Sequence, residues 1–189
     1  MRRQLFPALV AIALFTVLAL GYGIVTTLVD EVLFSHQAAG SLVKDSKGRV
    51  VGSSLIGQNF KAAQYFHPRP AADDYAAGPD YSYGSNYGPT NPTFLKGVED
   101  AVKAYRKENG LSSDVSVPVD AVTASGSGLD PAITVANAKL QAPRVARERH
   151  VPLATVLRLV DEHTEDRTFG VLGEPAVNVL ELNLALDRL

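Results

Sequence analysis

The feature of this sequence that most constrains its fold is an uncharged apolar run near the N-terminus, from Leu5 to Val29. As a helix this run would be about 37 Å long, and the hydrocarbon core of a bilayer is about 30 Å thick. The run is therefore long enough to cross a membrane with some tilt. We expect Pro7 to lie in the first turn of this helix, where a missing N–H costs little.

A cleaved secretory signal is the competing interpretation of this run. The apolar core of such a signal spans about 7–15 residues and leads to a small-residue cleavage site. Here the apolar run is longer, and Gly21-Tyr22-Gly23 is followed by further apolar residues. The sequence therefore favours an uncleaved anchor.

The charges that flank the run predict its orientation. Arg2 and Arg3 precede it, Asp30 and Glu31 follow it, and basic residues beside a membrane helix are retained in the cytoplasm. The predicted topology has three parts: cytoplasmic residues 1–4, transmembrane residues 5–29 and one exported domain at 30–189. In a bacterial cell this describes a single-pass protein of the plasma (inner) membrane, with its C-terminal domain in the periplasm or its equivalent.

Composition excludes several classes of function. The chain carries 18 basic and 20 acidic residues, so it has no field that would attract nucleic acid. It has no cysteine, which excludes disulfides and thiolate sites. Its four histidines lack the clustered spacing of a metal site. We therefore predict no bound metal.

The sequence of the exported part predicts a mixed α+β domain. Residues 41–56 indicate two short strands joined by a turn at 45–48, where Gly48 suits a left-handed position. Residues 64–92 form a long loop rich in Pro, Gly, Tyr and Asn, and such loops are usually functional or disordered. Phe66 and the tyrosines give this loop apolar area to bury, which argues against plain disorder.

A helix is predicted after this loop, capped by Asn91 and closed by Gly110. Its apolar stripe is predicted to be core and consists of Phe94, Leu95, Val98, Val102 and Tyr105. Residues 115–124 favour an edge strand or an irregular extended piece.

Further helices are predicted in the C-terminal third. Thr134 caps one that Pro143 interrupts or restarts, and Pro152 opens another. The tail at 177–189 fits either a strand, by its alternating leucines, or a helix, by its composition.

The Ser/Gly turn at 123–131, "TASGSGLDP", allows two interpretations. A Gly-rich turn before a helix can aim backbone N–H groups at an anion. However, it lacks the lysine of a phosphate loop, has two glycines where a dinucleotide loop needs three, and contains an aspartate that would repel phosphate. The structural alternative is that Gly126 and Gly128 allow a tight reversal, and that Asp130 with Pro131 starts the following helix.

Other catalytic patterns are weak. Ser125 and Ser127 have no obvious His/Asp partners. "HTED" at 163–166 is either acid–base equipment or the end of a helix running into a polar loop. From the residues alone we predict a membrane-anchored exported domain with no catalytic residue.

Six motifs then identify a family: "GQNF" at 57–60, "YFHPRP" at 65–70, "GSNYGPTNP" at 84–92, "VPVDAVTASGSGLDPAIT" at 117–134, "QAPRVARERH" at 141–150 and "HTEDRTFGVLGEPAVNVLELNLALDRL" at 163–189. Together with the anchor they resemble the C subunit of the Kdp-type potassium-transporting P-type ATPase of bacteria. The motif residues that are candidate interaction sites are Gln58, Phe60, Arg69, Asn86, Gly88, Pro89, Asn91, Ser125, Gly126, Ser127, Gly128, Asp130, Pro131, Gln141, Arg144, Gly173, Glu174, Asn178 and Asn183.

The resemblance implies a non-catalytic subunit of a four-part complex. Its partners would be an A subunit with the potassium path, a B subunit that hydrolyses ATP and a small F subunit. The family's C subunit is described as a catalytic chaperone that raises the ATP affinity of the B subunit. No tightly bound cofactor is implied, and ATP would be met only through the catalytic subunit. Because the predicted orientation keeps the domain away from cytoplasmic ATP, either this effect is indirect or the topology is unusual.

Two other functions remain alternatives. One is a stand-alone, membrane-tethered periplasmic enzyme or nucleotide-binding protein that uses the Ser/Gly turn and Glu174. The other is a passive spacer.

The resemblance also gives the membrane helix a docking role. Ala19, Gly23 and Thr27 lie four residues apart on one face, and Thr16 extends that face. Helices in lipid associate through small residues, so we expect this face to pack on the transport subunit. Alternatively, the helix is only a tether.

Overall fold

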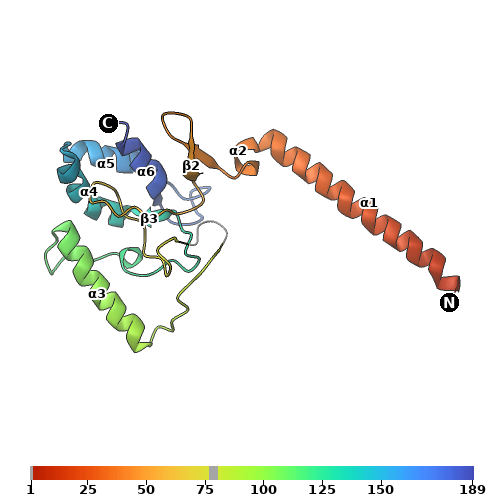
Figure 1. The fold of residues 1–189 in the computed structure, drawn as a ribbon, viewed down its shortest axis with the longest axis horizontal. Coiled ribbons are helices and arrows are strands. Elements are labelled where there is room, and N and C mark those ends of the chain that lie inside the picture. Colours follow the sequence, from red (N-terminus) through yellow and green to blue (C-terminus); the bar gives the residue numbers. More distant parts are fainter. Residues whose placement is uncertain (1, 77–80) are drawn as a thin grey trace. The chain divides into compact units, whose positions relative to one another are not determined.

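A computed structural model describes residues 2–76 and 81–189 of the chain. The chain divides into two compact units, residues 1–42 and 43–189 (Figure 1). The observed fold is mixed α/β, with one N-terminal apolar helix ahead of an α/β domain, as predicted.

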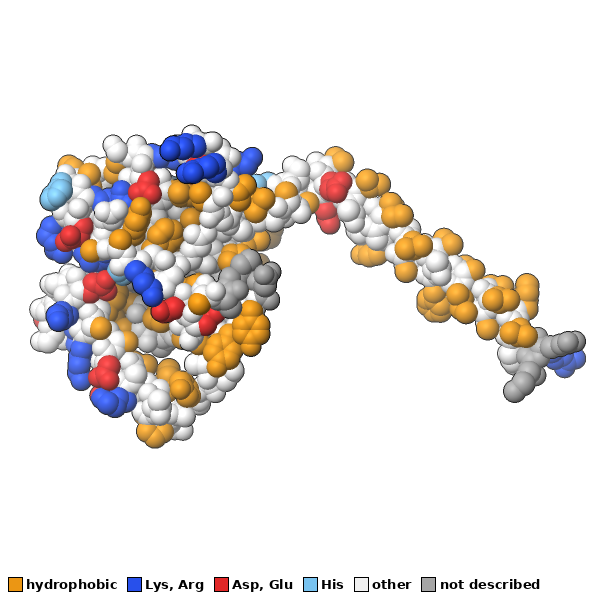
Figure 2. All heavy atoms as spheres, in the orientation of Figure 1, with side chains coloured by type: hydrophobic (Ala, Val, Ile, Leu, Met, Phe, Trp, Pro, Cys, Tyr) orange, Lys and Arg blue, Asp and Glu red, His pale blue; other side chains and the backbone are white. Residues whose placement is uncertain are grey.

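The first unit is dominated by helix α1, which runs from Arg2 to Leu33 and is followed by the short helix α2, Ser35–Ala38. Its apolar part reaches a mean hydropathy of 2.4, which is long and apolar enough to cross a membrane. Figure 2 shows hydrophobic side chains along this helix and acidic ones gathered near its C-terminal end. The helix extends past both ends of the apolar run, so Pro7 lies beyond the first turn and not within it.

A small hairpin follows helix α2 along the chain. Strands β1 (Leu42–Lys44) and β2 (Val50–Ser53) pair with each other, as predicted. The Asp45 carboxylate accepts hydrogen bonds from the backbone N–H groups of Lys47 and Arg49, both at 2.9 Å. Gly48 takes the left-handed conformation that the turn needs, with φ of +76°.

The core is built from three helices and one sheet. The helices are α4 (Val135–Arg149), α5 (Leu153–Glu162) and α6 (Val179–Leu186). The antiparallel sheet has the order β3 (Ala132–Thr134), β5 (Ala176–Asn178), β4 (Thr164–Glu165). The buried cluster that joins them includes Phe66, Ile133, Val145, Val156, Val160, Val177, Leu182 and Leu186.

Helix α4 begins at a side-chain cap and is held past a proline by packing. The Thr134 hydroxyl accepts from the backbone N–H of Asn137 at 3.1 Å, as a cap should. The prediction that Pro143 interrupts this helix is wrong. Helix α4 continues through it, because Ala142 and Val145 beside it are buried in the core and hold the helix by packing.

The tail at 177–189, for which both a strand and a helix were predicted, contains both. Strand β5 is followed directly by helix α6.

Helix α3 (Pro92–Asn109) corrects one prediction. Asn91 caps it and Gly110 closes it in the left-handed conformation, as expected. Its apolar stripe is not core, however: only Tyr105 of that stripe is buried, and Leu95 is 51% exposed. The reason is that α3 packs on α4 near its C-terminal end, while its first turns lie at the edge of the domain (Figure 1).

The structure also tests two predictions about irregular segments. Phe66 is fully buried and Tyr65 and Tyr75 are half-buried, so the first part of the long loop buries aromatic area as predicted. Tyr81, Tyr83 and Tyr87 are exposed. The segment 115–124 takes the second of its two predicted forms: it is an irregular stretch that contains the 3-10 turn η2 (Val119–Ala121).

Candidate functional site

A hydrogen-bonded group of motif residues surrounds Arg144, a cation on α4 that is only 1% exposed. Its Nε donates to Asn109 Oδ1 at 3.0 Å, and its Nη2 donates to Gln141 Oε1 at 2.8 Å. Its Nη1 donates to the backbone oxygens of Ala63 and Tyr65. Burial lowers the pKa of Arg144, and the nearby Glu108 opposes that shift. This guanidinium therefore joins α4 to the end of α3 and to the long loop.

Two amide side chains hold the same loop by its backbone. Asn183 accepts from Phe66 N–H at 2.8 Å and donates to Phe66 C=O at 2.9 Å. Gln141 does the same for the next residue, His67, at 2.8 and 3.1 Å. These amides supply the partners that a neighbouring strand would otherwise provide to a buried backbone. We call Gln141, Arg144 and Asn183 the polar clamp, and residues 63–67 the clamped segment.

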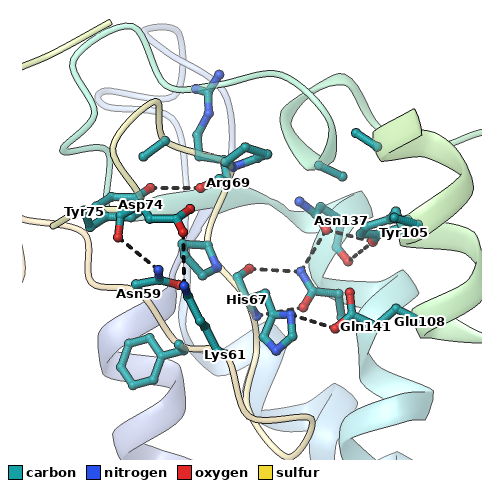
Figure 3. Close-up of a pocket in the computed structure, with 17 residues that line it drawn as sticks. Asn59, Lys61, His67, Arg69, Asp74, Tyr75, Tyr105, Glu108, Asn137 and Gln141 are labelled. Atoms are coloured by element: carbon teal, nitrogen blue, oxygen red, sulfur yellow. Dashed lines mark hydrogen bonds and ion pairs between the residues drawn. The ribbon is translucent and has the colours of Figure 1, made fainter. Parts of the chain in front are cut away.

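A second layer supports the clamp (Figure 3). Asn137 Oδ1 accepts from Gln141 Nε2 at 2.9 Å and from the Tyr105 hydroxyl at 2.8 Å. Asn137 Nδ2 donates to Asp120 at 2.9 Å. Burial is the main cause that raises the pKa of Tyr105. Helix α3 is therefore tied to α4 by polar contacts at its C-terminal half.

His67 adds a contact to Glu108 at the C-terminal end of α3. Its Nδ1 lies 3.0 Å from Glu108 Oε1, and its Nε2 lies 3.2 Å from the carbonyl oxygen of Ala62. Both ring nitrogens thus face acceptors. The hydrogen bond from His67 is the main cause that lowers the pKa of Glu108.

A cavity of about 420 Å³ opens beside the clamp, between residues 59–75 and α3. Figure 3 shows Lys61, Asp74 and Asn59 on one wall and Tyr105, Asn137 and Gln141 on the other. Lys61 Nζ and Asp74 Oδ2 are 3.0 Å apart. Burial raises the pKa of the Tyr75 hydroxyl to about 12. Among residues 2–76 and 81–189, no group of three or more His, Cys, Asp or Glu side chains is placed to hold a metal ion.

The Ser/Gly turn is joined to the clamped loop by Arg69, whose Nη1 lies 2.8 Å from Asp130 Oδ2. Asp130 Oδ1 accepts from the backbone N–H of Ala132, so Asp130 and Pro131 lead into strand β3 and not into a helix as predicted. Because the turn precedes a strand, it has no helix N-terminus to offer an anion.

The hydroxyls of the turn satisfy its own backbone. Ser125 Oγ accepts from Gly128 N–H, and Ser127 Oγ accepts from Leu129 N–H, both at 3.1 Å. Each hydroxyl thus serves an N–H two or three residues further on, as in Asx- and ST-type turns. These two N–H groups are therefore directed at side chains of the turn itself.

The turn packs backbone to backbone against residues 82–84. The carbonyl oxygen of Ser127 accepts from Tyr83 N–H at 3.0 Å and from the Ser82 hydroxyl at 2.9 Å. A Cβ added at Gly128, whose φ is +71°, would lie 2.7 Å from the carbonyl oxygen of Tyr83. An added Cβ at Gly126 would meet open space, and its φ is not positive. Only Gly128, and not both glycines as predicted, is required by the reversal.

The remaining candidates fall into two groups. Three of them bind the hairpin or the core: Gln58 Nε2 donates to Val51 C=O, Asn178 Nδ2 donates to Ser54 C=O, and Phe60 packs on the core beside the Tyr65 ring. The others are exposed, and they are Asn86, Gly88, Pro89, Gly173 and Glu174. On α1, an added Cβ at Gly23 would meet open space, so the small-residue face with Thr16, Ala19 and Thr27 stays a predicted docking face.

Sequence reasoning missed Tyr105, Asn109, Asp120 and Asn137 as site residues. A signal for one of them was present. Asn137, Gln141 and Arg144 recur at helical spacing beside the apolar Ala138, Ala142 and Val145. Polar side chains on the buried side of a helix indicate an internal hydrogen-bond network.

The chain is similar over its full length to known proteins. The family model described as "KdpC: K+-transporting ATPase, c chain" matches residues 5–188. A protein of Mycobacterium tuberculosis (strain ATCC 25618 / H37Rv) is 57% identical over 192 residues, covering 100% of both chains. A protein of Geobacter sulfurreducens is 49% identical over 189 residues, covering 99% of this chain and 98% of its own. Both are named "Potassium-transporting ATPase KdpC subunit". The chain therefore belongs to the KdpC family, subunits of the potassium-transporting ATPase, as its motifs predicted.

Proposed function

We propose that this chain is a non-catalytic accessory subunit that assembles and stabilises the potassium-transporting complex. Its partners are the potassium-conducting A subunit, the ATP-hydrolysing B subunit and the small F subunit. The observation that carries the proposal is the use of the motif side chains Gln141, Arg144 and Asn183. All three are held by hydrogen bonds within the domain, to its backbone and to neighbouring side chains, which suits a rigid binding scaffold and leaves them unavailable for turnover.

Co-purification tests this proposal. The tagged chain, extracted in detergent, should recover two larger membrane proteins, one of which carries an Asp-Lys-Thr-Gly-Thr phosphorylation motif. A chain that is recovered alone, with a catalytic activity of its own, would instead support the tethered periplasmic enzyme.

We place the N-terminus in the cytoplasm and the domain outside it. The support is the charge difference between Arg2–Arg3 and Asp30–Glu31 across the apolar helix. A reporter that is active only in the cytoplasm, fused after Leu189, should be silent. A strong signal from that fusion would reverse the orientation.

With this orientation, the chain can raise the ATP affinity of the B subunit only indirectly, through α1 and the transport subunit. The internal pairing of the Ser/Gly turn supports this route, since its Gly128 and Leu129 N–H groups are directed at Ser125 and Ser127. The KM for ATP of the complex should rise when the chain is removed, whereas the isolated chain should bind no ATP. Tight ATP binding by the isolated chain would contradict the indirect route.

The membrane helix is the proposed contact for this coupling. Replacing Ala19 and Gly23 by Leu keeps the helix apolar but fills its small-residue face. Recovery of the transport subunit and potassium-stimulated ATP hydrolysis should both fall. Leu14→Ile, on the opposite side, is the matched control and should change neither. An unrelated anchor of equal length that supports full activity would show that the helix is only a tether.

A further inference from the structure

The connection between β4 and β5 carries apolar side chains into solvent. Phe169 is 90% exposed, Val171 72% and Leu172 59%. The two strands are antiparallel neighbours, which a hairpin loop of about 2–5 residues is enough to join. Here the connection runs from 166 to 175, so it is longer than chain closure requires. We call residues 167–174 the β4–β5 tip.

The tip is an ordered turn. Thr168 and Leu172 exchange backbone hydrogen bonds at 2.9 and 3.0 Å, and Gly170 N–H donates to Arg167 C=O at 2.9 Å. At its base, Arg167 Nη2 lies 2.6 Å from Glu174 Oε2. These bonds fix the backbone so that the apolar side chains are displayed to solvent.

The backbone conformation of Phe169 is energetically unfavourable. Its φ is +55°, in the left-handed region that bulky side chains rarely adopt. Burial of its ring does not compensate, because the ring is in solvent. Strained residues that the surrounding structure over-determines are concentrated at binding sites. The tip therefore has the features of a surface built to be covered.

Charge indicates what covers it. In sequence, Glu165, Asp166 and Glu174 flank the apolar residues together with one basic residue, Arg167. Arg167 pairs with Glu174, so the carboxylates of Glu165 and Asp166 leave this collar with a net negative charge. A lipid surface with anionic headgroups attracts basic segments, so this acidic collar disfavours the bilayer. It matches a protein surface whose apolar pocket has a basic rim.

We propose that the β4–β5 tip inserts Phe169, Val171 and Leu172 into a basic-rimmed apolar pocket on the extracytoplasmic surface of another subunit of the same complex. This inference rests on the proposed accessory function and orientation. An aromatic side chain flanked by aliphatic ones, surrounded by a polar rim, is the usual composition of an interface anchor.

Photo-crosslinking identifies the occupant. The probe is p-benzoyl-phenylalanine placed at position 169 of the full chain, expressed with the other subunits. Its matched control is the same probe at Val119, a side chain that is also 72% exposed, on η2. An adduct from position 169, and not from 119, with one of the larger subunits supports the proposal. Adducts to lipid, to a second copy of the chain or to nothing would overturn it.

Substitution measures the contribution of the tip. Phe169→Ser combined with Val171→Ser should lower recovery of the larger subunits at limiting concentration by about tenfold or more, because interface anchors typically carry that much affinity. Val119→Ser should leave recovery unchanged. The midpoint of urea unfolding should not fall in either variant, since the removed side chains are already in solvent.

The outcomes separate this inference from the one on which it rests. If the unmodified chain recovers no larger subunit, the accessory function itself fails. If the unmodified chain and the Phe169→Ser, Val171→Ser variant recover those subunits equally, only the docking role of the tip fails.

Discussion

Two irregular segments of the domain are fixed by opposite means. The clamped segment, residues 63–67, is held by the long polar side chains of Gln141, Arg144 and Asn183. Residues 82–84 are held by direct approach of one backbone to another, at Gly128 and Ser127. The clamped segment therefore depends on specific long side chains, whereas the contact with residues 82–84 depends on Gly128 having no side chain.

This difference predicts how each segment fails. In the clamp, loss of one partner leaves buried acceptors unsatisfied in several elements at once. At Gly128 of the turn, any added side chain both collides with a neighbour and takes an unfavourable φ. Substitutions at the two places can therefore be compared on one scale, the free energy of unfolding.

The largest effect is expected from Arg144→Met. It keeps most of the side-chain volume but leaves the oxygens of Ala63, Tyr65 and the buried Asn109 without their donor. The free energy of unfolding should fall by about 3–5 kcal/mol, measured by urea titration of the full chain in detergent. Arg147→Met, exposed on the same helix, should change it by less than about 0.5 kcal/mol. Equal losses in the two variants would mean that the clamp does not hold the segment.

Gly128→Val should cost about 2–4 kcal/mol of unfolding free energy, since a β-branched residue must take φ of +71° beside the Tyr83 carbonyl. Gly126→Val is the control, and its loss should stay below about 1 kcal/mol because its Cβ meets open space. Similar losses at both glycines would restore the view that the whole turn is conformationally constrained.

Gln141→Met should cost about 2–3 kcal/mol, because the N–H and C=O of His67 lose both partners. The control Gln64→Met changes an exposed glutamine of the same loop and should be near neutral. Thermal or urea unfolding detects the difference without any nucleotide. A Gln141 variant with unchanged stability would point to a ligand-binding role for this side chain instead.

The smallest effect is expected from the contact between His67 and Glu108. The pKa of Glu108 is lowered in the folded state, so its stabilising contribution is present above its ordinary value of 4.5 and is lost as pH falls below that value. Since the carboxylate is 41% exposed, the contribution should be only a few tenths of a kcal/mol. The difference in urea midpoint between the unmodified chain and Glu108→Gln should shrink from pH 6 to pH 4. Glu99→Gln, on the exposed side of α3, should show no such change.

Local features of the fold could be predicted from the sequence. The membrane-length helix, the Asn91 and Thr134 caps, the Gly110 stop and the turn at Gly48 were all confirmed. Each depends on residues within a few positions of one another, where hydrogen-bond geometry and backbone φ are set by the residue type itself. The motif set likewise identified the KdpC family.

The site depended on contacts that sequence spacing does not contain. Asn183 meets Phe66 across 117 residues, and Arg144 meets Tyr65 across 79. Sequence patterns therefore selected these side chains as important but not as partners of a backbone segment. The same reason explains why the α3 stripe was wrongly predicted to be core: amphipathic spacing indicates a face, but only the neighbouring elements determine whether that face is covered.

The sequence by itself determined the anchor, the caps, the hairpin turn and family membership, since these follow from local chemistry and composition. Only the tertiary structure decided that Gln141, Arg144 and Asn183 point inward, that Gly128 and not Gly126 is indispensable, and that Asp130 leads into a strand. The physical reason is that buried polar groups must find partners wherever the chain brings them. That pairing is set by the packing of the whole domain.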